Sequence, residues 1–237
     1  MTQPQVTTLN WKPVALPGPV TLRGRYVTLE PLDAVRHAAA LWQAVRGPGQ
    51  VAGDPGNDRL WTYLGDGPYA SEADLCRAIE EKQTSENAVF LAIVPGSTGE
   101  VAAYASYMRI DPSHGVVEVG NILLSPGLQR TTAATEAMYL MAGHAFDHLG
   151  YRRYEWKCNA ENQPSRQAAL RLGFTFEGIF RQHMVVKGEN RDTAWFSMLD
   201  TEWPARKKAL EAWLAPANFD SDGTQRRKLS DFFKTEA

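Results

Sequence analysis

Two features in residues 116–146 carry groups that could do chemistry. The first is Glu118, a carboxylate inside the segment Val116–Leu124, which is otherwise rich in β-branched and aliphatic residues and is therefore predicted to be a largely buried strand. A charge in such a strand is either paired with an opposite charge or used in a reaction, because an isolated charge is costly to bury. We keep both interpretations of Glu118, as the partner of an arginine and as a proton acceptor.

The second feature is the loop at residues 129–134. The sequence Ser-Pro-Gly at 125–127 ends the strand, because proline cannot donate to a ladder and glycine admits unusual backbone angles. Thr131 or Thr132 can cap a helix over residues 133–148, which are rich in strong helix formers. The loop would then present free backbone amides at a helix N-terminus, where phosphate binds well. The alternative is an ordinary strand–helix connection without a ligand.

Polar side chains also recur at three-residue intervals after a predicted strand at residues 151–157, at Asn159, Asn162 and Ser165. Asn162 or Ser165 can begin a helix that Gly173 ends. Side chains of this kind can cap the helix, line a ligand, or do both.

These segments resemble the acyl-CoA-binding blocks of the GNAT acetyltransferase superfamily, and in particular its RimJ/RimL-like branch. The loop at 129–134 (QRTTAA) is similar to the family pattern [QR]xxGx[GA], with Thr132 in the usual glycine position. The sequence TEA at 135–137 and the NxxNxxS block, followed by LGF ending at Phe174, match the branch. The resemblance covers residues 22–199.

The resemblance implies an α/β (α+β) fold with a GNAT-like mixed, mostly antiparallel sheet, a splayed parallel strand pair and flanking helices. It also implies an acyl-CoA-dependent N-acyltransferase, with acetyl-CoA as the expected co-substrate and a peptide N-terminus or small amine as acceptor. Succinyl-CoA and other donors fit as well. The alternative is an acyl-CoA-binding sensor or partner protein of the same fold. Thr132, and the lack of a tyrosine between Asn159 and Phe174 to act as general acid, keep that alternative open.

The resemblance further implies roles for individual positions. Glu118 would accept the proton of the amine, directly or through water, while Asn159 and Ser165 would lie near the thioester and its leaving sulfur. The residues expected to bind the pantetheine arm by their backbone are Asn121, Ile122, Leu123 and Leu124. The residues expected around the pyrophosphate are Gln129, Arg130, Thr131, Thr132, Ala133 and Ala134, and Asn159, Asn162 and Ser165 complete the co-substrate site. The residues expected to line the acceptor site, or else to seal the edge of the core, are Trp61, Tyr63 and Tyr69.

Composition and the remaining motifs narrow the class of protein. The 237 residues include 25 basic and 27 acidic side chains, for a net charge of −2, so no basic field indicates nucleic acid. We find no signal peptide and no apolar run long enough to span a membrane, and two cysteines fit a reducing compartment, so we expect a cytoplasmic protein. His144 and His148 have metal-ligand spacing but lack the HExxH carboxylate, so we predict no metal site. A homodimer is left open.

The chain is expected to divide into an extended segment (1–20), a single N-acetyltransferase domain (21–200) and a C-terminal helix with a loosely held tail (201–237). The predicted strands cover residues 20–29, 88–94, 100–110, 116–124, 151–157, 174–180 and 191–199. The predicted helices cover residues 34–45, 71–81, 133–148, 162–172 and 203–214. The strand at 151–157 should pair in parallel with 116–124, because a helix crosses between them.

Overall fold

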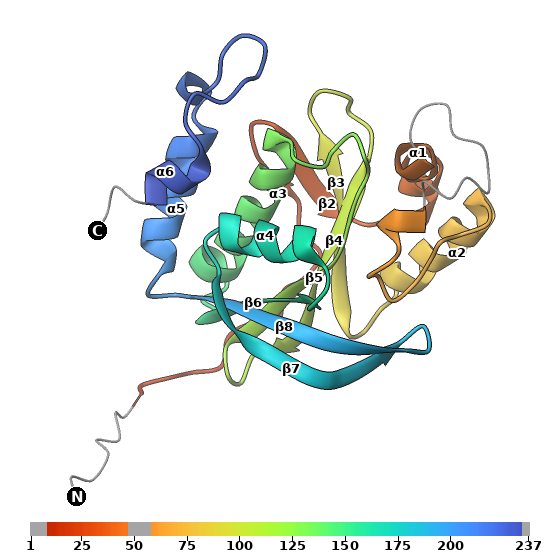
Figure 1. Ribbon diagram of the computed structural model, residues 1–237, viewed down its shortest axis with the longest axis horizontal. Coiled ribbons are helices and arrows are strands. Elements are labelled where there is room, and N and C mark those ends of the chain that lie inside the picture. Colours follow the sequence, from red (N-terminus) through yellow and green to blue (C-terminus); the bar gives the residue numbers. More distant parts are fainter. Residues whose placement is uncertain (1–8, 47–57, 234–237) are drawn as a thin grey trace, which may run out of the picture.

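The computed structural model describes residues 9–46 and 58–233 (Figure 1). Residues 1–8, 47–57 and 234–237 lie outside the described part; they include the ends of the predicted terminal segments and the first half of a predicted loop-rich region at 47–67.

Eight strands form one sheet in the order β1-β2-β3-β4-β5-β6-β8-β7. Their bounds are β1 Leu22–Arg23, β2 Val27–Pro31, β3 Ala88–Pro95, β4 Ala103–Asp111, β5 Val116–Leu124, β6 Arg153–Asn159, β7 Thr175–Val186 and β8 Glu189–Leu199. All neighbours are antiparallel except β5 and β6. The predicted mixed sheet with one parallel pair is confirmed.

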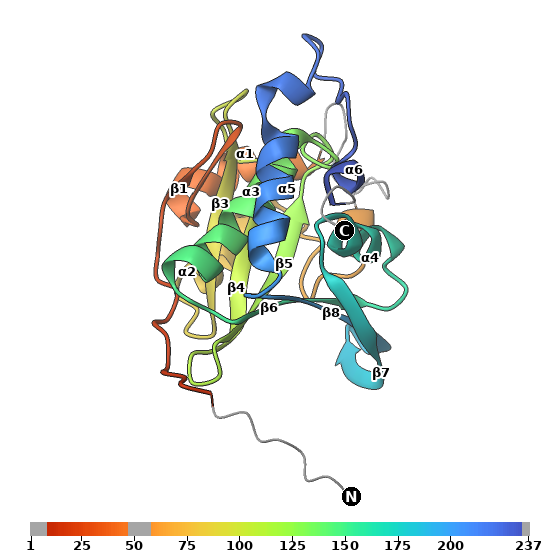
Figure 2. The same cartoon turned by 90° about the vertical axis from the view of Figure 1, so that its left-hand side faces the viewer.

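Helices cover both faces of this sheet, and each face has its own core (Figures 1 and 2). On one face, α1 (Ala34–Arg46) and α2 (Glu72–Gln83) pack over β3 and β4. On the other face lie α3 (Thr132–Gly143), with its π-helical extension His144–His148, α4 (Gln163–Arg171), α5 (Trp203–Leu214) and α6 (Leu229–Phe233). The short 3₁₀ turns are Asp58–Leu60 and Pro216–Asn218. Within the described ranges, we find no helix with the length and apolarity that a membrane crossing requires.

The parallel pair separates along its length. β5 and β6 pair only from Val116 opposite Arg153 to Val119 opposite Trp156, although both strands continue further. A β-bulge in β5 lies where they separate, since Asn121 has a positive φ of 50° and the register with β4 shifts there. The predicted splay is therefore present, and it leaves one backbone edge of β5 without a strand neighbour among the described residues.

The single strand predicted at residues 20–29 was wrong, because this segment is a hairpin of β1 and β2. The buried carboxylate of Glu136 on α3 accepts hydrogen bonds from the amides of Arg25 (2.9 Å), Tyr26 (2.6 Å) and Val27 (3.0 Å). A Cβ at Gly24 would lie only 2.4 Å from Glu136 Cδ, so a side chain there would displace the carboxylate from the three amides. The turn is thus held by a residue distant in sequence, which alternation along 20–29 could not show.

The prediction that the first strand of the last hairpin ends at residue 180 was also wrong. β7 continues to Val186 and turns through Lys187 and Gly188, whose φ values of 52° and 81° suit a tight hairpin turn. A register shift between Phe180 and Met184, with Gln182 at φ 51°, lets the strand bend without ending. The polar residues at the bulge hid the strand's continuation.

The prediction of a loosely held tail was wrong for residues 216–233. Asn218 is buried and donates to the carbonyl groups of Trp213 (3.0 Å) and Arg227 (3.2 Å), while its own oxygen accepts from the Arg227 amide at 3.1 Å. One asparagine thereby closes the tail back onto the end of α5, since it satisfies backbone groups on both segments.

The N-terminal segment is extended and strapped across the domain from residue 9 onward. Trp11 Nε1 donates to the Ser113 carbonyl at 2.7 Å, and Tyr151 Oη donates to the Ala15 carbonyl at 3.1 Å. The predicted extended segment is therefore held against the domain by hydrogen bonds in its described part.

Candidate functional site

The loop at 129–134 joins the splayed end of β5 to the start of α3. Thr131 is the N-cap of α3, because its Oγ1 accepts from the Ala134 amide at 3.2 Å. Arg130 has a positive φ of 63°, which turns successive amides toward one side of the loop. Among the described residues, no acceptor bonds the amides of Arg130, Thr132 or Ala133. The helix start therefore offers free donors to an anion.

The end of β5 presents backbone and side-chain groups at the splay. Asn121 Nδ2 donates to Ser106 Oγ at 3.0 Å, which fixes the bulge against β4. Ile122 and Leu124 pack against the α3 core, whereas Leu123 is buried under α1 and α2. Leu123 and Leu124 pair with β4 on one edge, so their other edge is available to an extended ligand arm.

The NxxNxxS block begins α4, and its three polar side chains have different partners. Asn162 is the N-cap, with its Oδ1 accepting from the Ser165 amide at 3.1 Å. Asn159 Oδ1 accepts from the Glu161 amide at 2.9 Å, and Asn159 Nδ2 has no acceptor among the described residues. Ser165 Oγ accepts from Trp156 Nε1 at 2.9 Å. Capping therefore belongs to Asn162 and leaves the Asn159 amide group free to donate.

Cys158 lies beside this block at the end of β6, where it is buried. Burial raises the pKa of its thiol, and the hydrogen bond with Ser165 offsets this only in part. A thiol in such surroundings is poorly nucleophilic at neutral pH, so Cys158 is a core residue.

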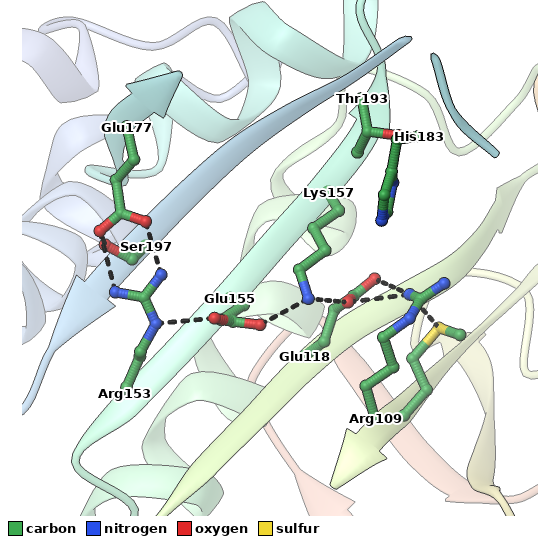
Figure 3. A network of polar contacts seen from close by, with 10 residues as sticks. Arg109, Glu118, Arg153, Glu155, Lys157, Glu177, His183, Thr193 and Ser197 are labelled. Atoms are coloured by element: carbon green, nitrogen blue, oxygen red, sulfur yellow. Dashed lines mark hydrogen bonds and ion pairs between the residues drawn. The ribbon is translucent and has the colours of Figure 1, made fainter. Parts of the chain in front are cut away.

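Glu118 is 2% exposed and lies between two cations (Figure 3). Arg109 Nη1 lies 2.8 and 2.9 Å from its two oxygens, and Lys157 Nζ lies 3.0 Å from Oε2. The ion-pair interpretation of Glu118 is therefore realised in the structure. A proton-accepting role would require the amine, or a water, to share this carboxylate with Arg109 or Lys157.

The ion pair is one end of a row of alternating charges (Figure 3). Lys157 Nζ also lies 2.7 Å from Glu155, whose other oxygen accepts from Arg153 Nε at 2.7 Å. Arg153 continues to Glu177 at 2.8 Å, and Ser197 Oγ donates to Glu177 at 2.7 Å. The row lies on the sheet face that carries α1 and α2, because successive β6 residues alternate between this face and the α3 core.

Sequence reasoning missed Arg109, Lys157 and His183 as members of this site. The alternation of Arg153, Glu155 and Lys157 with buried aromatic residues along β6 was a signal for the charged face. Arg109 gave no such signal, because it lies at a bulge with a φ of 44°. His183 Nδ1 lies 3.0 Å from Thr193 Oγ1, on the same side of the sheet as Lys157 (Figure 3).

The three aromatic residues expected at the acceptor site are placed differently from one another. Trp61 is 3% exposed and packs edge-to-face on Tyr69 at 5.1 Å between ring centroids; its position fits the core-sealing interpretation. Tyr69 lines an open pocket of about 500 Å³ and donates to Asp66 at 2.6 Å, and burial raises its pKa. Tyr63 is half-buried. Lys187, at the β7–β8 turn, donates to the Trp61 carbonyl at 2.8 Å, so the hairpin tip closes onto this region.

In the described part of the chain, no three His, Cys, Asp or Glu side chains lie close enough together to hold a metal ion. Asp147, beside His144 and His148, instead accepts from Trp203 Nε1 at 2.8 Å and from Lys207 at 2.9 Å.

Comparisons with known proteins agree with this geometry. Residues 27–175 match the family model described as an acetyltransferase (GNAT) domain. The crystal structure of a GCN5-related N-acetyltransferase from Brucella melitensis is similar with a TM-score of 0.89 and 48% identity, over 95% of this chain and 99% of that chain.

Two curated relatives extend the similarity. The chain is 28% identical to the uncharacterized N-acetyltransferase p20 of Bacillus licheniformis over 130 residues, which are 55% of this chain and 72% of the relative. It is 31% identical to the ribosomal-protein-serine acetyltransferase of Escherichia coli (strain K12) over 83 residues, which are 35% of this chain and 46% of that enzyme. Because the family model spans well over half of the sequence and the splayed β5–β6 pair and capped loop are in place, the chain belongs to the GNAT acetyltransferase family and is a transferase.

Proposed function

We propose that this protein transfers an acetyl group from acetyl-CoA to the amine of a peptide N-terminus or a small molecule. The observation that carries the proposal is the continuity of the site. The free edge of β5 leads directly into a loop whose amides at Arg130, Thr132 and Ala133 lack acceptors among the described residues.

This continuity fits the two ends of an acyl-CoA. The pyrophosphate would accept from the loop amides at the start of α3, with Gln129, Thr131 and Ala134 shaping the loop. The pantetheine arm would add to the free backbone edge at residues 121–124, as an extended peptide adds to a sheet. Thr132 replaces the family's usual glycine, and its hydroxyl would serve as an additional donor.

The reaction would take place where β5 and β6 diverge. The amine nitrogen attacks the thioester carbon, the C–S bond breaks, and the sulfur leaves as the thiol of CoA after taking up a proton. A backbone amide of β5 would stabilise the oxyanion, and the free amide group of Asn159 would donate to the leaving sulfur beside Ser165. Glu118 would take the amine's proton through a water that also contacts Arg109 or Lys157.

The acceptor we favour is an α-amine. An α-amine has a pKa near about 7.7–8.0, against about 10.4 for a lysine side chain, so more of it is neutral and nucleophilic near pH 7. The relative named ribosomal-protein-serine acetyltransferase supports a protein N-terminus as the first candidate. Tyr63 and Tyr69 would contact the acceptor, while Trp61 supports them from the core.

Non-catalytic binding of acyl-CoA is the second candidate function. The observation that favours it is the occupation of both Glu118 oxygens by cationic donors, which leaves no carboxylate oxygen unengaged for the amine.

A screen of acceptors with acetyl-CoA and succinyl-CoA, measured as release of free thiol, tests both candidates. Thiol release that depends on an amine supports the transferase. Tight binding of CoA without thiol release for any amine would overturn it in favour of the sensor.

A further inference from the structure

Cations outnumber carboxylates on the charged face beside the splay. The carboxylates are Glu118, Glu155 and Glu177, and the cations are Arg109, Arg153, Lys157 and Arg191. Each carboxylate has at least one partner within this row. Arg191 forms no ion pair or side-chain hydrogen bond with any described residue, so it is the surplus charge.

The unpaired state of Arg191 is costly for the protein. Its Nε is fully buried without a hydrogen-bond partner, and buried polar atoms of this kind are rare because they lose water without compensation. Burial is the main cause that lowers the pKa of Arg191, and the nearby guanidinium of Arg109 lowers it further. Two guanidinium groups held close together, one of them without a partner, are an arrangement that an anion would stabilise.

Arg191 lies where the proposed chemistry takes place. β8 pairs with β6 only from Thr193, opposite Asn159, onward. Arg191 lies two residues before Thr193, nearer the start of β8 and beyond the end of β6. Cys158 and Glu118 lie near enough to Arg191 to interact with its charge, and they offset in part the lowering of its pKa. These two residues are on the two strands that diverge. Arg191 and Trp195 lie on the same face of β8, because residues 191, 193 and 195 alternate with the buried Ala194. The Trp195 ring lies 3.7 Å from Lys157 Nζ.

We propose that Arg191, together with the unused donors of Arg109, binds a carboxylate carried by the substrate. A carboxylate suits the site because one edge of a guanidinium offers two parallel N–H donors that match its two oxygens. The carboxylate belongs either to the acceptor, close to its amine, or to the far end of a dicarboxylic acyl group on CoA. The proposal rests on the proposed function, since it concerns the substrate of the same site.

The test compares wild type, Arg191→Gln and Arg191→Lys with matched substrates. The acceptor arm uses peptides that begin with Asp or Asn, and alanine against alaninamide. The donor arm uses succinyl-CoA against acetyl-CoA. We expect wild type to prefer the carboxylate member of one arm by roughly 10-fold or more in kcat/KM, as a charge-assisted hydrogen bond allows. Arg191→Gln should remove that preference while neutral substrates change little.

Arg191→Lys keeps the charge without the two-donor edge, so it should retain only part of the preference. Arg181→Gln is the matched control, because Arg181 is an exposed arginine on the same hairpin, and it should behave as wild type. The melting temperature of Arg191→Gln should stay equal or rise, since the variant removes a half-buried charge without an ion-pair partner whose Nε is buried and unsatisfied. An arginine with a merely structural role would instead give a lower melting temperature.

Equilibrium binding separates this proposal from the proposed function. If no substrate releases thiol, the same carboxylate pairs are compared by the shift in melting temperature. A larger shift in melting temperature with the carboxylate member of a pair, lost in Arg191→Gln, would support the anion site. This result would hold even if the protein were not a transferase. Equal kinetics and equal binding for every pair in wild type, or a preference that persists in Arg191→Gln, would overturn the proposal.

Discussion

The substitution Glu118→Gln separates the structural role of the buried ion pair from a role in proton transfer. Glutamine keeps the shape of the side chain and one oxygen, but it removes the charge that Arg109 and Lys157 share. The two roles make different predictions, because the first concerns the free energy of unfolding and the second concerns the dependence of kcat on pH.

The stability cost follows from the partners that remain. Removing one member of a buried ion pair costs about 3–5 kcal/mol when the other is left alone. Here Lys157 keeps Glu155 at 2.7 Å, and the Arg109 side chain is 39% exposed, so water screens its loss. A hydrogen bond to a charged group contributes about 1.5–3 kcal/mol, against about 0.5–1.5 for a neutral one. We therefore expect the free energy of unfolding to fall by about 1–2 kcal/mol, measured by urea denaturation.

The catalytic prediction concerns the shape of the pH–rate profile. If Glu118 takes the proton, kcat of Glu118→Gln should fall at neutral pH and recover in part as the pH approaches the pKa of the acceptor, near about 7.7–8.0 for an α-amine. At that pH about half of the amine is already neutral, and hydroxide and buffer take up its remaining proton more readily, so the reaction depends less on Glu118. The shift in melting temperature with CoA should stay intact, since Glu118 does not contact the loop at 129–134.

Glu155→Gln is the matched control for both measurements. Glu155 is also buried and also shares Lys157, but its second partner is Arg153 rather than Arg109. It should lose a similar amount of stability and keep the wild-type pH profile. A Glu118→Gln variant whose pH–rate profile equals that of wild type would refute the assignment of Glu118 as the base.

Three further predictions concern the co-substrate site and its support. Thr132→Glu should abolish the CoA-induced rise in melting temperature, because a carboxylate would repel the pyrophosphate; an unchanged rise would remove the loop from the site. Asn162→Ala should lower the free energy of unfolding by about 1 kcal/mol, because it removes the N-cap of α4. Asn159→Ala should instead lower kcat by a larger free energy than it lowers stability. Full kcat in Asn159→Ala would contradict the role of Asn159 as a donor. Glu136→Ala should destabilise by about 3 kcal/mol, since it removes three hydrogen bonds to a charged acceptor and leaves the buried Val27 amide without a partner. Urea denaturation close to wild type would show that water replaces the carboxylate.

The sequence predicted most elements because their signals are local. The apolar run in β5 and the cap at Thr131 each depend on a few neighbouring residues, and the parallel pairing of β5 with β6 followed from the helix between them. The β1–β2 turn could not be predicted this way, since its geometry depends on Glu136, more than 100 positions away. The closed tail depends in the same way on Asn218, whose partners lie on two separate segments.

The candidate site was predicted in its backbone more than in its side chains. Local sequence predicted the two helix starts, with Thr131 and Asn162 each as one of two candidate caps. The place of Asn121 at the splay was implied by the family resemblance. The partners of Glu118 come instead from β4 and β6, and neither could be named without the register between strands. Arg191 was also missed, because only the three-dimensional structure shows that its Nε is buried without a hydrogen-bond partner.

Two irregularities between β4 and β5 determine where Glu118 and its partner meet. One bulge places Arg109 at a φ of 44°, and the other places Asn121 at a φ of 50°. Only a short regular ladder remains between them, from Ser106 opposite Gly120 to Met108 opposite Glu118. In an unbroken strand Arg109 would point to the opposite face from Met108, away from Glu118. The bulge instead brings the Arg109 guanidinium to Glu118, and there it also lies near Arg191. The charge balance of the site therefore depends on a backbone irregularity that side-chain periodicity does not encode.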